Sequence, residues 1–149
     1  MKNGLLAFLL LLAGFVSAQE VEFDKKTNFV SVEGKNSFKL VREDCGFSTD
    51  CHFEAFDMDN NKVFRITLRS FNSPVEISKS NPQGNVNYYE FVFLGTQQKA
   101  EIEYMGLNPK IVAKTIVKND LFLDGKLNQK GVDEFILIQG TPFKERIKF

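Results

Sequence analysis

Cysteine and histidine side chains carry the most obvious chemistry of this chain, and they lie close together. Cys45 and Cys51 are the only cysteines, five residues separate them, and His52 is the only histidine. A thiol nucleophile and its histidine base must reach each other, but adjacent residues of a strand, such as Cys51 and His52, point to opposite faces. The spacing matches no standard zinc motif and is longer than that of common redox pairs. We therefore predict a structural disulfide between Cys45 and Cys51, and no metal site.

A second group of polar residues has the spacing of calcium ligands. Asp57, Asp59 and Asn61 match the first three positions of an EF-hand loop, but Lys62 stands where glycine is required and Leu68 where a bidentate glutamate is required. We interpret the segment as a turn between two strands.

Glu90 differs from the other carboxylates because aromatic residues surround it in the sequence. This apolar segment is the best candidate for a surface that contacts a ligand or partner, together with the loop 78–85, since binding residues often lie on loops of a rigid scaffold. The predicted site residues are Tyr88, Tyr89, Glu90, Phe91 and Phe93.

The same glutamate supports an alternative with catalytic chemistry. A carboxylate among aromatic rings needs a cation beside it, here Arg65 or Arg69 from a neighbouring strand, or its pKa rises. An acid with a raised pKa could serve a small hydrolase if a second titratable group reached the same cleft. Glu101 and Glu103 are poor candidates for that second group, because they occupy the polar face of an exposed strand.

Alternation of apolar and polar residues indicates the elements that position these side chains. The alternation has period two from Val21 to Met105, which is typical of antiparallel strands. In Lys62–Phe71 it places apolar residues on one face and Arg65, Thr67 and Arg69 on the other. Between Val86 and Leu94 both faces are apolar, which predicts a central strand or one covered on both sides.

The period changes after Met105. Asn108 and Pro109 are a typical helix start, and Asn128 can cap a second helix that ends near Gly140. The sequence therefore predicts an α+β fold, with an antiparallel sheet of about five to seven strands in residues 21–105 followed by two amphipathic helices packed on one face.

Residues 1–18 have the pattern of a secretory signal peptide. A short basic start precedes the apolar run Leu5–Leu12, and small residues up to Ala18 stand at the cleavage position. We expect cleavage after Ala18, a single domain in residues 19–149, and a location in the periplasm or outside the cell. The apolar run is too short to cross a bilayer, so we expect no stable membrane insertion.

Composition restricts the partners of the mature chain. Removal of Lys2 leaves 18 basic residues against 19 acidic ones, and neither sign forms long runs. Binding of nucleic acid requires clustered positive charge, so a nucleic-acid partner is not expected. No glycine-rich phosphate loop is present, and we expect no cofactor.

These observations leave three function classes open. The favoured one is a non-enzymatic exported module that binds a protein partner or a small apolar ligand. The first alternative is the carboxylate-dependent hydrolase around Glu90. The second is a small outer-membrane β-barrel, suggested by the terminal aromatic residue Phe149, although Glu145 interrupts the apolar pattern before it.

Overall fold

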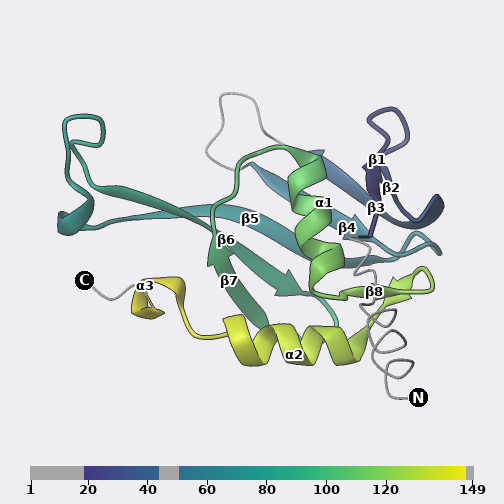
Figure 1. Cartoon of the computed structure of the whole chain (residues 1–149). Helices are drawn as coiled ribbons and strands as arrows, with labels where there is room; N and C mark the ends of the chain where they lie inside the picture. The colour runs from purple at the N-terminus through teal and green to yellow at the C-terminus, as the bar shows by residue number, and fades with distance from the viewer. Residues whose placement is uncertain (1–18, 44–50, 147–149) are drawn as a thin grey trace, which may run out of the picture.

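The computed structural model describes residues 19–43 and 51–146, and seven antiparallel strands form its main sheet. The strands are adjacent in chain order, so each pairs with the next (Figure 1). They are β1 (Val21–Phe23), β2 (Phe29–Val32), β3 (Lys35–Glu43), β4 (His52–Phe56), β5 (Lys62–Asn72), β6 (Asn85–Phe93) and β7 (Lys99–Glu103). The predicted α+β class and strand number are confirmed.

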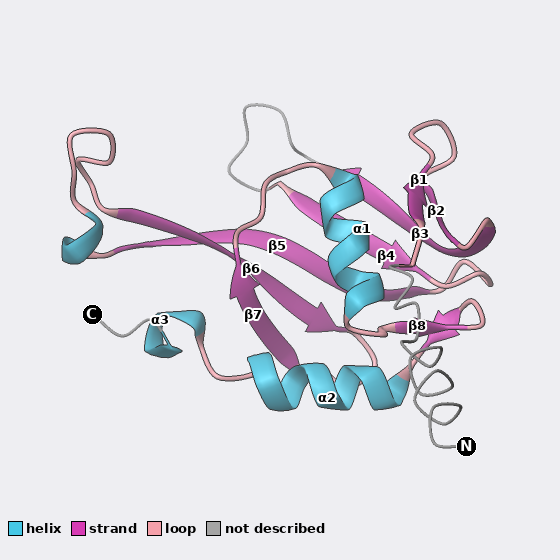
Figure 2. Ribbon diagram, in the orientation of Figure 1, coloured by secondary structure: helices cyan, strands magenta, loops and turns pink. Residues whose placement is uncertain are grey.

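The helices follow the sheet and cover one of its faces. Helix α1 (Pro109–Lys118) crosses the strands, and α2 (Gln129–Gln139) runs along the end of β7 (Figure 2). A short hairpin of β8 (Phe122–Leu123) and β9 (Lys126–Leu127) connects them. Two further helical segments are short. They are the 3₁₀ helix η2 (Pro74–Glu76), between β5 and β6, and α3 (Phe143–Arg146), after α2.

The two predicted helix starts are both correct in position but differ in mechanism. The Asn108 side chain accepts a hydrogen bond from the Lys110 N–H, which caps α1 as expected. Asn128 stands at the N-cap of α2 without a capping bond, and its side-chain amide instead donates to the Asp120 carbonyl. The second asparagine therefore fixes the incoming hairpin rather than the helix.

The sheet has two unlike faces, because alternate residues of each strand point in opposite directions. We call the side that packs on α1 and α2 the helix-covered face and the other side the open face. The helix-covered face and the helices form one core of aromatic and aliphatic side chains. Its most buried members include Val30, Phe38, Leu40, Phe53, Phe64, Ile66, Tyr89, Phe91, Phe93, Val112, Ile116, Leu121, Val132 and Phe135.

Strand β6 is not central, contrary to one form of the prediction. It is the sixth of seven strands, beside the edge strand β7. Its second apolar face arises because Tyr88 lies between the rings of Phe71 and Phe143, at centroid distances of 6.1 and 5.8 Å. Phe143 belongs to α3, so the chain after α2 passes around the β7 edge to reach the open face.

Two predictions concern residues that the structure does not describe. The predicted signal peptide in residues 1–18 lies outside the described residues, and so does Cys45, the predicted disulfide partner of Cys51. Residues 143–146 form α3, and residues 147–149 lie outside the described residues. Within residues 19–43 and 51–146, no helix has the length and apolar character needed to span a membrane.

Candidate functional site

The structure divides the five predicted site residues between the two faces of β6. Tyr89, Phe91 and Phe93 each expose about 1% of their surface and pack in the core. Phe91 and Phe93 both contact the Phe135 ring of α2 edge-on, at centroid distances of 5.1 and 6.3 Å. These three rings are therefore part of the core and do not contribute to an exposed surface. The candidate surface on β6 is therefore Tyr88 and Glu90.

Tyr89 is held in the core by its polar end as well. Its hydroxyl donates a 2.7 Å hydrogen bond to the Gly106 carbonyl in the connection between β7 and α1. Burial raises the pKa of Tyr89 well above its usual range. The phenol therefore acts as a neutral hydrogen-bond donor that ties the sheet to the first helix.

Glu90 lies on the open face between two cations. One carboxylate oxygen accepts hydrogen bonds from the Arg69 Nε and Nη2 atoms, at 3.1 and 3.0 Å, and the other lies 3.0 Å from the Lys99 Nζ atom. Burial raises the pKa of this carboxyl, but the hydrogen bonds from Lys99 and Arg69 outweigh it and hold the pKa below its usual value. Glu90 is thus a stable carboxylate with two cationic partners.

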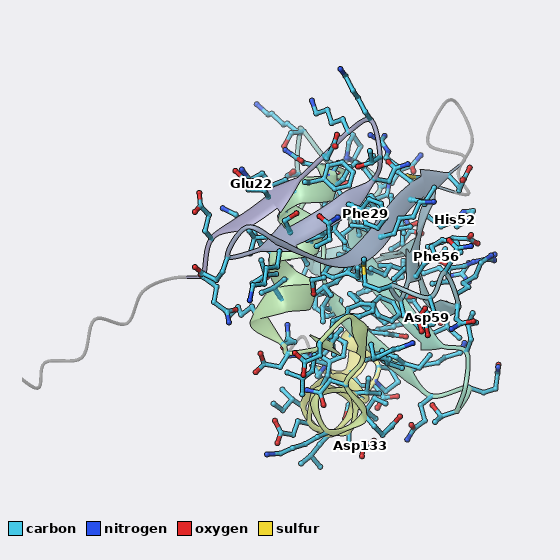
Figure 3. The ribbon with its side chains drawn as sticks, turned by 90° about the vertical axis from the view of Figure 1, so that its right-hand side faces the viewer. Glu22, Phe29, His52, Phe56, Asp59 and Asp133 are labelled. Atoms are coloured by element: carbon cyan, nitrogen blue, oxygen red, sulfur yellow. The ribbon has the colours of Figure 1, made fainter. Side chains whose placement is uncertain are left out.

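Glu54 is the centre of a second, similar cluster. Its carboxylate lies 2.7 Å from the Lys62 Nζ atom, 2.8 Å from Arg65 Nη2 and 3.7 Å from His52 Nε2. Burial again raises the pKa, and the hydrogen bonds from Lys62 and Arg65 lower it below the usual value. Figure 3 shows His52 on the side of the sheet opposite α1, together with Phe56.

The two clusters show what could be read from the sequence and what could not. Of the two arginines expected beside Glu90, Arg69 is its partner, whereas Arg65 binds Glu54. Lys99 was missed, because it reaches Glu90 diagonally from β7 and the pairing of β6 with β7 cannot be read from either strand alone. The polar alternation of β5 did predict that both arginines share one face.

Charges on the open face are arranged in layers. The side chains of Glu54 and Glu90 expose only 12% and 10% of their surface, while those of their cationic partners expose between 37% and 58%. A molecule that approaches this part of the sheet therefore meets ammonium and guanidinium groups above buried carboxylates. Two further acids lie at the margin on β7, where the Glu101 carboxylate accepts a 2.5 Å bond from the Phe143 N–H and Glu103 is exposed.

An aromatic cluster adjoins these charges at the β7 side of the open face. The rings of Phe71, Tyr88 and Phe143 are in contact and only partly buried, and the Lys144 ammonium lies 5.9 Å from the Phe71 centroid. Burial, followed by the carboxylates of Glu101 and Glu90, raises the pKa of Tyr88. Half-buried rings beside cations are common in protein-binding surfaces.

The acidic segment between β4 and β5 is a turn, as predicted. The Asp57 carboxylate accepts hydrogen bonds from the backbone N–H groups of Asp59 and Asn61, at 3.0 and 2.8 Å. Lys126 of β9 forms ion pairs with Asp57 and Asp59, so a lysine ammonium occupies the place where a cation would bind. No group of three or more metal-ligating side chains occurs in the described part of the chain.

Two grooves of the surface lie away from Glu90. One of about 340 Å³ lies between β3, the β4–β5 turn and the β8–β9 hairpin, lined by Met58 and Phe122 among others. Another of about 460 Å³ lies between β7, α1 and α2, lined by Ile102 and Phe135 among others. Glu90 lines neither groove.

Comparison with known proteins finds no relative of this chain. No protein-family model, curated protein or solved structure matches this chain.

Proposed function

We propose that this chain is an exported binding protein that contacts a protein partner through its open face. The observation that carries the proposal is the layered surface around Glu54 and Glu90, with exposed cations beside the half-buried ring of Tyr88. Arginine and aromatic side chains are enriched in protein interfaces. This surface lies on the side of the sheet opposite α1 and α2. One face of the sheet therefore forms the core, and the other is free to contact a partner.

Two observations favour a protein partner over a small apolar ligand between the sheet and the helices. The aromatic side chains of β6 that face α2 are already packed against Phe135. Moreover, the groove between the sheet and helices is bordered by charged and amide groups, including Lys118, Asn119 and Arg146. Sites for apolar ligands are concave and mostly apolar.

The geometry of Glu90 also favours binding over the hydrolase alternative. A general acid at neutral pH needs a raised pKa and an accessible cleft. The pKa of Glu90 is held low, both carboxylate oxygens are engaged by Arg69 and Lys99, and the residue lines neither groove. These are the features of a carboxylate that organises a surface.

Export remains part of the proposal on the strength of the sequence. The signal peptide would be removed after Ala18, and β1 begins at Val21, so cleavage would leave the sheet intact. An oxidising compartment would favour a disulfide between Cys45 and Cys51. Mass spectrometry of the protein recovered from its own cells tests this. We expect an N-terminus at Gln19 and a mass two hydrogen atoms below that of the reduced chain, whereas a retained leader would contradict export.

Site-specific photo-cross-linking tests the binding face. Thr67 lies on the open face, in register with Glu90, and can be replaced by benzoylphenylalanine in cells of the natural host. Exposed Lys114 on α1 provides the matched control position. A defined protein captured from position 67 and not from position 114 is the expected result. Equal capture at both positions, or none at position 67, would contradict the proposal.

A further inference from the structure

Strands β5 and β6 extend beyond the rest of the sheet. Pairing of β5 with β4 ends at Thr67, and pairing of β6 with β7 ends at Tyr88, whereas β5 and β6 continue to pair as far as Asn72 and Asn85. We call residues 69–87 the arm. Figure 1 shows it projecting from the sheet as a two-stranded ribbon.

Side-chain amides brace the tip of the arm. The Asn81 side chain accepts from the Asn85 N–H at 2.9 Å and donates to the Asn85 carbonyl at 3.0 Å. The Asn72 amide donates to the Gln83 carbonyl at 2.8 Å and to the Asn85 side chain at 2.9 Å. The tip is therefore ordered by its own hydrogen bonds before any partner binds, which lowers the entropy cost of binding.

Close backbone contact adds to this bracing. The Ser73 N–H donates to the Gly84 carbonyl at 2.7 Å, and Gly84 has a φ of +63°. A Cβ atom at position 84 would lie 2.1 Å from the Ser73 carbonyl oxygen. Because only glycine fits there, residues 73 and 84 at the two ends of the tip can approach closely enough to form this hydrogen bond.

The braced tip presents aliphatic side chains to solvent. Val75, in η2, is 65% exposed, and Ile77, the first residue after η2, is 59% exposed. Residues 73–84 contain only two charged residues, Glu76 and Lys79, although 26% of the whole chain is charged. Exposed aliphatic groups on a surface depleted of charge are typical of the centre of a protein interface.

The composition of the tip distinguishes a protein partner from a lipid surface. Membrane-anchoring loops use aromatic side chains at the interface and several basic residues toward the headgroups. Residues 73–84 contain no aromatic residue and a single lysine, while serine, asparagine and glutamine supply adaptable hydrogen-bonding groups. A convex tip of this kind fits a concave apolar site on a folded protein.

We propose that the arm inserts Val75 and Ile77 into an apolar pocket of the protein partner, while the open face at its base contacts the rim of that pocket. The inference rests on the proposed function, because it names the anchor of the same interface. Tyr88 marks the junction, since the arm begins where β6 leaves β7. The partner is thus a folded protein with a pocket that accepts branched aliphatic side chains.

Benzoylphenylalanine at position 75 tests this placement directly. We expect the same protein to be captured from positions 75 and 67. Capture at position 67 alone would overturn the arm inference and leave the proposed function standing, whereas capture at neither would overturn both. Capture of a second copy of this chain, or of lipid alone, from position 75 would also overturn the inference.

Competition measures the contribution of the aliphatic side chains. Unlabelled purified protein is added to the position-67 cross-linking reaction in an extract of the cell envelope. The variant Val75→Ser/Ile77→Ser should require roughly 10- to 100-fold more protein than wild type to compete, because two buried aliphatic contacts are lost. Leu137→Ser is the matched control, since Leu137 on α2 is 86% exposed. Equal competition by wild type and the arm variant would overturn the inference, and unchanged thermal unfolding verifies that the variant is folded.

Discussion

The two faces of β6 are built from adjacent residues but are held together by different forces. On the helix-covered face, Phe91 is buried against Phe64 and Phe135. On the open face, Glu90 is nearly as buried, at 8% exposed, but lies between Arg69 and Lys99. The comparison teaches that low exposure alone does not define the core, because a charge can be buried beneath its own counterions.

The two kinds of contact also differ in how much stability is lost when a side chain is removed. An aromatic core side chain is in contact on all sides, so its loss leaves a cavity that neighbours fill only partly. The cations around Glu90 are about half exposed, so they can be hydrated again if the carboxylate is removed. The core should therefore dominate stability, while the open face can vary with the partner.

Removal of a core ring should give the largest effect. Phe91→Ala is expected to lower the free energy of unfolding by about 3–5 kcal/mol, measured by urea denaturation. Val92→Ala, one residue along and on the open face, should cost about 1 kcal/mol or less. Similar losses for the two variants would break the distinction between the faces.

Neutralisation of the buried carboxylate should give an intermediate effect. Glu90→Gln is expected to lower the free energy of unfolding by about 1–2 kcal/mol, because its three charge-assisted hydrogen bonds from Arg69 and Lys99 become weaker and these exposed cations are rehydrated. Glu103→Gln, on the exposed end of β7, serves as control and should change it by less than about 0.5 kcal/mol. If Glu90→Gln lowered the free energy of unfolding no more than the control, the ion pairs of Glu90 would not stabilise the fold.

Acid should lower the stability of the domain, and the carboxylates of the open face should account for part of that loss. The pKa values of Glu54 and Glu90 are lowered in the folded protein, so their stabilisation is complete above the unfolded value of about 4.3 and is lost as pH falls through the lower folded values. The double variant Glu54→Gln/Glu90→Gln should therefore show a flatter decline below about pH 5. Unfolding by urea at several pH values measures how steeply the free energy of unfolding falls with pH in wild type and in the double variant. Burial raises the pKa of Asp57, but hydrogen bonds from Asn61 outweigh it and lower that pKa, so Asp57 should preserve part of the decline in both proteins.

The hydroxyls of the two adjacent tyrosines should give the smallest difference. Tyr89→Phe removes the buried bond to Gly106 and is expected to cost about 1 kcal/mol. Tyr88→Phe should change stability by less than about 0.5 kcal/mol, because its hydroxyl has no hydrogen-bond partner among the described residues. Thermal unfolding of both variants measures the difference, and a larger effect for Tyr88 would reverse the assignment of the faces.

Much of the candidate site was accessible from sequence because alternation in strands is a local signal. The pattern of β5 placed Arg65 and Arg69 together on one face, and the aromatic surroundings of Glu90 indicated that it needs a cation. The choice between the arginines was not accessible, because it depends on the register of β5 against β4 and β6. The burial of Phe91 was not accessible either, since an apolar strand does not itself show which of its faces the helices cover.

The sequence by itself determined the order of the main strands and the two longer helices, the turn at Asp57, the Asn108 cap of α1 and the presence of buried aromatic side chains. These features depend on residues a few positions apart, whose backbone preferences and hydrogen bonds act locally. Tertiary structure alone decided that Lys99 reaches Glu90, that Phe143 returns to stack on Tyr88, and that the arm projects beyond its neighbours. Those outcomes depend on strand lengths, register and contacts between distant segments, which minimise the free energy of the whole domain rather than of any one segment.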